Sequence, residues 1–110
     1  MSQSIRDLQS ASHQQAIKSG WHSDPRSIGD LICLMHSELS EALEEHRSGH
    51  LPNEIYESNT KPEGIPIELA DCVIRIMDFC SRYGIDLEAA IVQKMAFNAT
   101  RPYKHGGKTL

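Results

Sequence analysis

Apolar residues recur at helical spacing along two segments in the first half of the chain. The first segment, residues 4–19, has its apolar residues at positions 5, 8, 11, 16 and 17 and ends at Gly20. The second runs from about Pro25, with Asp24 as its expected N-cap, to Arg47. Both segments are therefore predicted to be helices with one apolar face each.

The second half of the chain contains two more helical patterns. One runs from about Pro66 to Gly84 and is apolar around most of its circumference, with its charged residues confined to a narrow arc. So wide an apolar surface predicts a central helix that is covered on several sides, in part by a second subunit. The other pattern opens at Asp86 as N-cap and runs to Arg101, where Pro102 ends it.

Residues 50–64 lie between these halves and show no sustained periodicity and no strand-like alternation. They are expected to form a long polar loop with at most one short turn. Residues 102–110 are expected to form a basic tail. The chain is therefore predicted to be one all-α domain over residues 1–110, a bundle of about four helices that is completed by dimerisation.

A net charge of −4 gives no general basic field, so a nucleic-acid polymer is not an expected partner. Cys33, Cys72 and Cys80 are odd in number and fit no zinc spacing, so they are expected to be small core residues in a reducing compartment. The first residues carry no apolar run, and no stretch is long enough to span a bilayer. The expected location is the cytoplasm, without a membrane partner.

Two acidic pairs at i, i+3 spacing are the strongest chemical signal in the chain: Glu38 with Glu41, and Glu68 with Asp71. This spacing puts both carboxylates of a pair on one helix face. Glu38 also lies within the apolar stripe of its helix, where an ionised carboxylate is costly unless something neutralises it. Four carboxylates from two helices suit Mg²⁺, with Mn²⁺ as the expected substitute, and Glu45 is a candidate further ligand. An ion held there can act on a phosphate-rich substrate.

The alternative for each pair is a set of ordinary solvent-facing charges, because E-x-x-E pairs occur in many helices. This alternative is strongest for Glu68 and Asp71, which have Arg75 and Arg82 beside them on the predicted helix. It is weaker for Glu38 because apolar residues flank that position.

Cationic and aromatic residues offer candidate contacts to a nucleotide. Lys94, Asn98 and Arg101 share a helix face, and together with Lys104 they can donate hydrogen bonds to a polyphosphate. The alternative is a solvated polar face with cations near a helix C-terminus. Trp21 is the only Trp, and it can either stack on a base or fill a helix junction.

No histidine site is expected from the sequence. There is no E-x-x-H motif, which argues against a carboxylate-bridged di-iron bundle. The common glycine-rich phosphate-binding loops are also absent.

The order of these motifs resembles that of the MazG-like nucleotide pyrophosphohydrolases, which belong to the all-α NTP pyrophosphatase superfamily. The residues that carry the resemblance are His36–Leu43, Glu68–Asp71, Lys94–Asn98 and Arg101–Lys108. Each acidic pair alone is a weak signal, whereas the ordered set is specific. The similarity covers nearly the whole chain, from about Gly20 to Lys108.

This resemblance implies hydrolysis of a (deoxy)nucleoside triphosphate between its α and β phosphates, which yields the monophosphate and pyrophosphate. The metal ligands that the resemblance implies are Glu38, Glu41, Glu68 and Asp71. Lys94 and Asn98 match positions that meet the substrate's phosphates or sugar. The family also implies a homodimer, or a homotetramer built as a dimer of dimers. Ser37 departs from the family's frequent E-E-x-x-E motif, so a fifth carboxylate is missing.

Three functions remain open at this point. The leading hypothesis is an enzyme that removes unwanted nucleotides from the (d)NTP pool. A second is a hydrolase of alarmones or other polyphosphorylated nucleotides. A third is a non-catalytic helical dimer that binds a nucleotide or a protein, in which case removing the charge of Glu38 should be neutral or stabilising.

Overall fold

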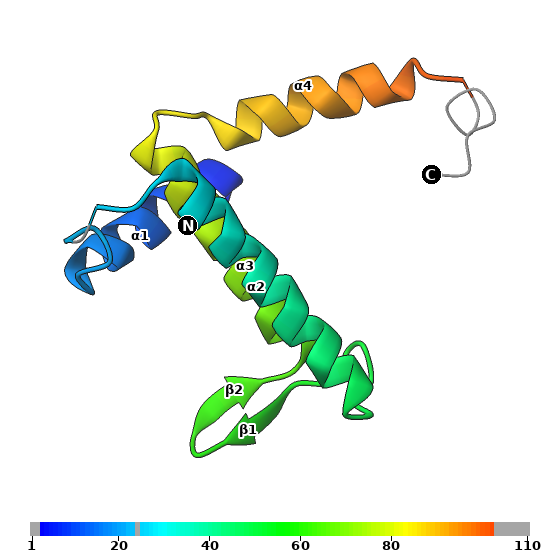
Figure 1. The fold of residues 1–110 in the computed structure, drawn as a ribbon. Coiled ribbons are helices and arrows are strands. Elements are labelled where there is room, and N and C mark those ends of the chain that lie inside the picture. The colour runs from blue at the N-terminus through cyan, green and yellow to red at the C-terminus, as the bar shows by residue number, and fades with distance from the viewer. Residues whose placement is uncertain (1–2, 24, 103–110) are drawn as a thin grey trace.

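The computed structural model describes residues 3–23 and 25–102. Within these residues the chain is mostly helical, which confirms the prediction of an all-α fold (Figure 1). The elements, in chain order, are α1 (Ile5–Lys18), α2 (Ile28–Arg47), β1 (Tyr56–Ser58), β2 (Lys61–Glu63), α3 (Ile65–Arg82) and α4 (Leu87–Ala99).

Side-chain caps explain where the helices begin. The hydroxyl of Ser27 accepts a hydrogen bond from the backbone N–H of Asp30 at 3.0 Å, so α2 begins at Ile28. The predicted start at Pro25 was therefore three residues too early, and Asp24 lies outside the described residues. Asp86 caps α4 as predicted, and accepts from the N–H of Ala89 at 3.1 Å.

The segment between α2 and α3 is not a simple loop, so that prediction was wrong. β1 and β2 form an antiparallel hairpin in which Tyr56 pairs with Glu63. Asn59 and Thr60 both have positive φ, 53° and 65°, which is the backbone of a two-residue hairpin turn. Strands of three residues are too short to show alternation, and Pro62 lies in one of them.

Helices α2 and α3 run antiparallel beside each other and form the centre of the molecule (Figure 1). The hairpin lies at one end of this pair, and α1 packs against α3 at the other end. Helix α4 begins near α1, where Arg6 forms ion pairs with Asp86 at 2.8 Å and Glu88 at 2.7 Å, and then projects away from the α2–α3 pair. This arrangement leaves most of α4 without cover from the described part of the chain.

The core of the single chain is small. Its buried apolar residues are Ala16, Ala42, Cys72, Met77 and Cys80. Cys72 and Cys80 are core residues as predicted, whereas Cys33 is exposed, which corrects the prediction for that residue. No large side chain among the described residues is completely buried.

Large apolar side chains remain on the surface of all four helices, including Leu8 and Ile17 of α1. The most exposed ones on α2, α3 and α4 are Ile28, Ile32, Leu39, Leu43, Leu69, Val73, Val92, Met95 and Phe97. The radius of gyration is 16.5 Å, against about 13 Å for a compact chain of this length. None of the helices in the described residues is long and apolar enough to cross a membrane.

Candidate functional site

The antiparallel contact between α2 and α3 brings three of the four predicted carboxylates together. Glu38, Glu41 and Glu68 each offer an oxygen, and the three oxygens lie within 4.8 Å of one another. Glu38 and Glu68 are only 7% exposed, whereas Glu41 faces solvent. Asp71 lies one helical turn after Glu68 on α3, is half-buried, and is not part of this three-residue group. We refer to Glu38, Glu41 and Glu68 as the acidic cluster.

Glu38 has one paired and one unpaired oxygen. The Nε of Arg75 donates a hydrogen bond to Glu38 Oε1 at 2.7 Å, which compensates part of the carboxylate's charge. Glu38 Oε2 is buried and has no hydrogen-bond partner among the described residues. An unpaired buried oxygen is costly, and this atom is available as an acceptor beside two other carboxylates.

Glu68 is the residue of the acidic cluster whose pKa is raised. Burial, a hydrogen bond with Glu41 and the charges of Glu41, Asp71 and Glu38 raise its pKa from 4.5 to about 7. A divalent cation would relieve this repulsion and could bind the unpaired oxygen of Glu38. Since all the donors are oxygens, the residues present fit Mg²⁺.

The hairpin brings a further carboxylate to Glu68. Oxygens of Glu45, Glu63 and Glu68 lie within 4.8 Å of one another, and Glu63 belongs to β2. The hydroxyl of Tyr56 donates to the two oxygens of Glu45 at 2.8 and 3.0 Å. This hydrogen bond, together with burial and the nearby carboxylates, raises the pKa of Tyr56 to about 12. Glu63 was missed from the sequence because a hairpin was not expected there. Glu45 had been a candidate further ligand.

A pocket with a volume of about 300 Å³ lies on the other side of Arg75. Its lining includes Trp21, Arg26, Phe79 and Arg82 as well as Arg75. The guanidinium carbon of Arg75 lies 5.3 Å from the centre of the Trp21 ring, and the same side chain reaches Glu38. Arg75 therefore connects the pocket to the acidic cluster, a role that its position beside two acids on a helix did not reveal.

Trp21 and Arg82 are the residues of this pocket that are best placed to contact a ligand. Trp21 is 48% exposed, so its ring is accessible from the pocket and does not fill a helix junction. Arg82 Nε is buried with no hydrogen-bond partner in the described part of the chain. An accessible indole and an unpaired guanidinium nitrogen suit a planar, anionic ligand.

The predicted contacts on α4 are not brought to the acidic cluster within one chain. Lys94 lies over the ring of Phe97, at 4.8 Å from its centre, on a helix with no buried residue. The helix ends at Ala99, two residues before the predicted end, so Arg101 lies just beyond it, at 5.8 Å from the same ring. Asn98 is on the same exposed helix, which projects away from α2 and α3 (Figure 1). Lys104 lies outside the described residues.

Comparisons with known proteins identified no relative of this chain. No family model matches the chain, and no curated protein and no solved structure was found to match it. The family resemblance therefore rests on the ordered motifs alone, and the chemistry is inferred from the geometry above.

Proposed function

We propose that this chain is a MazG-like, Mg²⁺-dependent pyrophosphohydrolase of (deoxy)nucleoside triphosphates. The observation that carries the proposal is the buried, unpaired oxygen of Glu38, which lies beside Glu41 and Glu68. The reaction consumes one water and one nucleoside triphosphate, and yields the nucleoside monophosphate and pyrophosphate. A function in clearing unwanted nucleotides from the pool suits this chemistry.

The acidic cluster would hold the ion. Bound Mg²⁺ supplies positive charge to the phosphoryl oxygens and lowers the pKa of a water. Asp71, one turn from Glu68 on α3, would complete the ligand set, and one of these carboxylates would orient the attacking water. Glu45 and Glu63 share Glu68 with the cluster and would support a second ion.

The pocket beside Arg75 would hold the nucleotide. Its volume of about 300 Å³ falls at the lower end of the range for small-molecule sites, roughly 300–1,000 Å³. The base would stack on Trp21, and the guanidinium groups of Arg26 and Arg82 would contact the phosphates. Arg75 spans from this pocket to Glu38, so it would compensate charge between the nucleotide and the acidic cluster.

The enzyme is proposed to act as a homodimer, or as a tetramer of two such dimers. Exposed apolar residues on α2 and α3 are available for contact with a second copy, and α4 carries three more. Lys94 and Asn98 are on α4, away from their own chain's acidic cluster. A partner's α4 could therefore supply the phosphate contacts that one chain does not bring together.

One observation favours a different function. The ion pair between Arg75 and Glu38 compensates the buried carboxylate without any metal, as expected for a non-catalytic nucleotide-binding dimer. The two functions differ in whether the nucleotide is consumed.

The direct test is product analysis on a panel of NTPs and dNTPs with purified protein. The proposal predicts equal amounts of monophosphate and pyrophosphate with Mg²⁺, and none after EDTA treatment. Release of inorganic phosphate and a diphosphate instead would contradict the assigned bond cleavage. Nucleotide binding without turnover under all conditions would replace the proposal by the non-catalytic dimer.

A further inference from the structure

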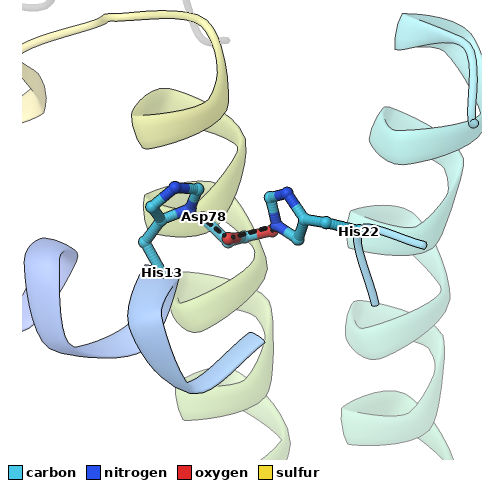
Figure 2. A group of neighbouring side chains, drawn as sticks. All are labelled: His13, His22 and Asp78. Atoms are coloured by element: carbon cyan, nitrogen blue, oxygen red, sulfur yellow. Dashed lines mark hydrogen bonds and ion pairs between the residues drawn. The ribbon is translucent and has the colours of Figure 1, made fainter. Parts of the chain in front are cut away.

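A second cluster of ligating side chains lies away from the acidic cluster, near the C-terminal end of α3. Figure 2 shows Asp78 of α3 between His13 of α1 and His22 of the connector that follows α1. His13 Nδ1 lies 2.9 Å from Asp78 Oδ1, and His22 Nε2 lies 3.0 and 3.1 Å from its two oxygens. Three separate segments of the chain therefore converge on one carboxylate.

These three side chains are largely buried, but the two histidines remain partly accessible to solvent. Asp78 is 7% exposed, and the side chains of His13 and His22 are 27% and 21% exposed. The two rings meet edge to face, with centres 4.9 Å apart. Asp78 also lines the pocket that contains Trp21 and Arg75, so an ion bound to Asp78 would face that pocket.

Two imidazoles and one carboxylate form a ligand set that first-row transition metals prefer and that Mg²⁺ does not. Ligand atoms bound tetrahedrally to Zn²⁺ at about 2.0–2.1 Å lie roughly 3.3 Å from one another. The nitrogen–oxygen separations of 2.9 to 3.1 Å are only slightly shorter. All three ligand atoms lie within 4.8 Å of one another, so a bound ion would move the nitrogens and oxygens apart by only a few tenths of an ångström.

The surroundings supply a further polar atom. Gln9 lies one turn before His13 on α1, and both residues line a hollow that also contains Cys80. Gln9 Oε1 is buried and has no hydrogen-bond partner among the described residues. Arg75 and Arg82 lie one turn before and after Asp78 on α3, yet among the described residues the side-chain hydrogen bonds of Asp78 are with the two histidines.

We propose that His13, His22 and Asp78 bind one divalent transition-metal ion of the Zn²⁺ class. The two clusters then differ in the metal they take, since the acidic cluster offers only oxygen and this one offers two nitrogens. Bound metal would join α1 and the connector to α3. Because His22 follows Trp21 directly, it would also fix the segment that carries the Trp21 ring at its pocket.

The test uses Co²⁺ as a spectroscopic probe on the full chain, with Mg²⁺ in excess to occupy the acidic cluster. Wild type is expected to bind one Co²⁺ per chain and to show visible bands of low-coordinate cobalt without a sulfur charge-transfer band. Zn²⁺ alone is expected to raise the temperature of unfolding. His22→Gln should weaken Co²⁺ binding at least about tenfold and abolish the Zn²⁺ effect.

His36→Gln is the matched control, because His36 is an exposed histidine on α2, and it should bind Co²⁺ like wild type. Asp78→Asn gives a second variant if His22→Gln does not fold. The proposal is overturned if wild type shows no saturable Co²⁺ binding, if His22→Gln binds as tightly as wild type, or if the spectrum shows thiolate ligands. The outcome is independent of the proposed hydrolase, whose carboxylates are different residues.

Discussion

Glu38 and Glu68 face each other across the contact between α2 and α3, and each is 7% exposed. The charge of Glu38 is compensated by Arg75 at 2.7 Å. Glu68 has only other carboxylates for neighbours in the cluster, and its pKa is raised to about 7. A proton and a metal ion would therefore compete for Glu68. The ionisation of Glu68 should therefore depend on whether a metal ion is bound.

The first prediction concerns the pH dependence of stability without metal. Because the folded protein binds a proton at Glu68 more tightly than the unfolded chain does, this residue favours folding most below pH 4.5. Its contribution should be lost as the pH rises to about 7, by about 1–2 kcal/mol after allowance for solvent screening. Urea denaturation in EDTA at several pH values measures this difference between wild type and Glu68→Gln.

Glu44→Gln is the control for that experiment, because Glu44 is an exposed acid on α2 that forms an ion pair with Arg47. It should keep the wild-type pH dependence between pH 4.5 and 7. Saturating Mg²⁺ should flatten the wild-type curve, since an ion neutralises the ionised carboxylate. A wild-type curve that is already flat in EDTA would show that Glu68 ionises normally.

A site residue could be predicted from the sequence where a charged side chain lies among apolar ones. Glu38 was identified because it lies in an apolar stripe, and it is buried. The partner Arg75 could not be identified, because spacing within α3 says nothing about contact with α2. His13, His22 and Asp78 also left no signal, since they are distant in sequence and only the packing of α1 on α3 brings them together.

At the scale of elements, helices were predictable because their apolar periodicity and caps are local. The hairpin was not, because a two-residue turn of Asn59 and Thr60 lacks the glycine that usually marks such turns. Thr60 is β-branched and adopts a positive φ of 65°, which the paired strands must stabilise. The missed hairpin matters for function, because β2 contributes Glu63 beside Glu68.

A second prediction tests the junction between the hairpin and α3. Gly64 has a φ of 125°, and a Cβ there would collide with the backbone carbonyl oxygen of Glu54. Gly64→Ala should therefore lower the free energy of unfolding by about 2–4 kcal/mol. Chemical denaturation of the variant measures this loss.

Gly49→Ala separates the collision from backbone strain. Gly49 has a φ of 93°, but a Cβ there would meet nothing within 4 Å. Its substitution should cost only about 1–2 kcal/mol. Equal losses for the two variants would mean that the backbone around Glu54 moves aside freely, contrary to the packing described here.

At the scale of the molecule, the single chain has too little core for its surface. Within residues 3–23 and 25–102 it buries only small or flexible apolar side chains, and it leaves Leu39, Leu43 and Val73 about half exposed. The residues at 28, 32, 39 and 43 follow one face of α2, which is the pattern of a helix contact. The apolar circumference of α3 had predicted a second subunit from the sequence, and dimerisation remains a prediction.

The third prediction is that Leu39→Glu dissociates the dimer without unfolding the chain. A charge in an apolar interface should raise the dissociation constant at least about 100-fold, whereas Leu39 is 47% exposed in the single chain. Ser40→Glu is the control, because it adds the same charge about a quarter-turn away on α2. Sedimentation of both variants over a concentration series measures the effect. Equal association of wild type and Leu39→Glu would remove this face from the interface.

The measurement that tests the central claim most directly is Mg²⁺-dependent pyrophosphate release by Glu38→Gln compared with Glu44→Gln. Both variants neutralise one acid on α2, but only Glu38 belongs to the buried cluster. If the cluster holds the catalytic ion, Glu38→Gln should lose at least about 100-fold in kcat/KM while its oligomeric state persists. Glu44→Gln should match wild type. Undiminished turnover by a folded Glu38→Gln would show that the chemistry takes place elsewhere.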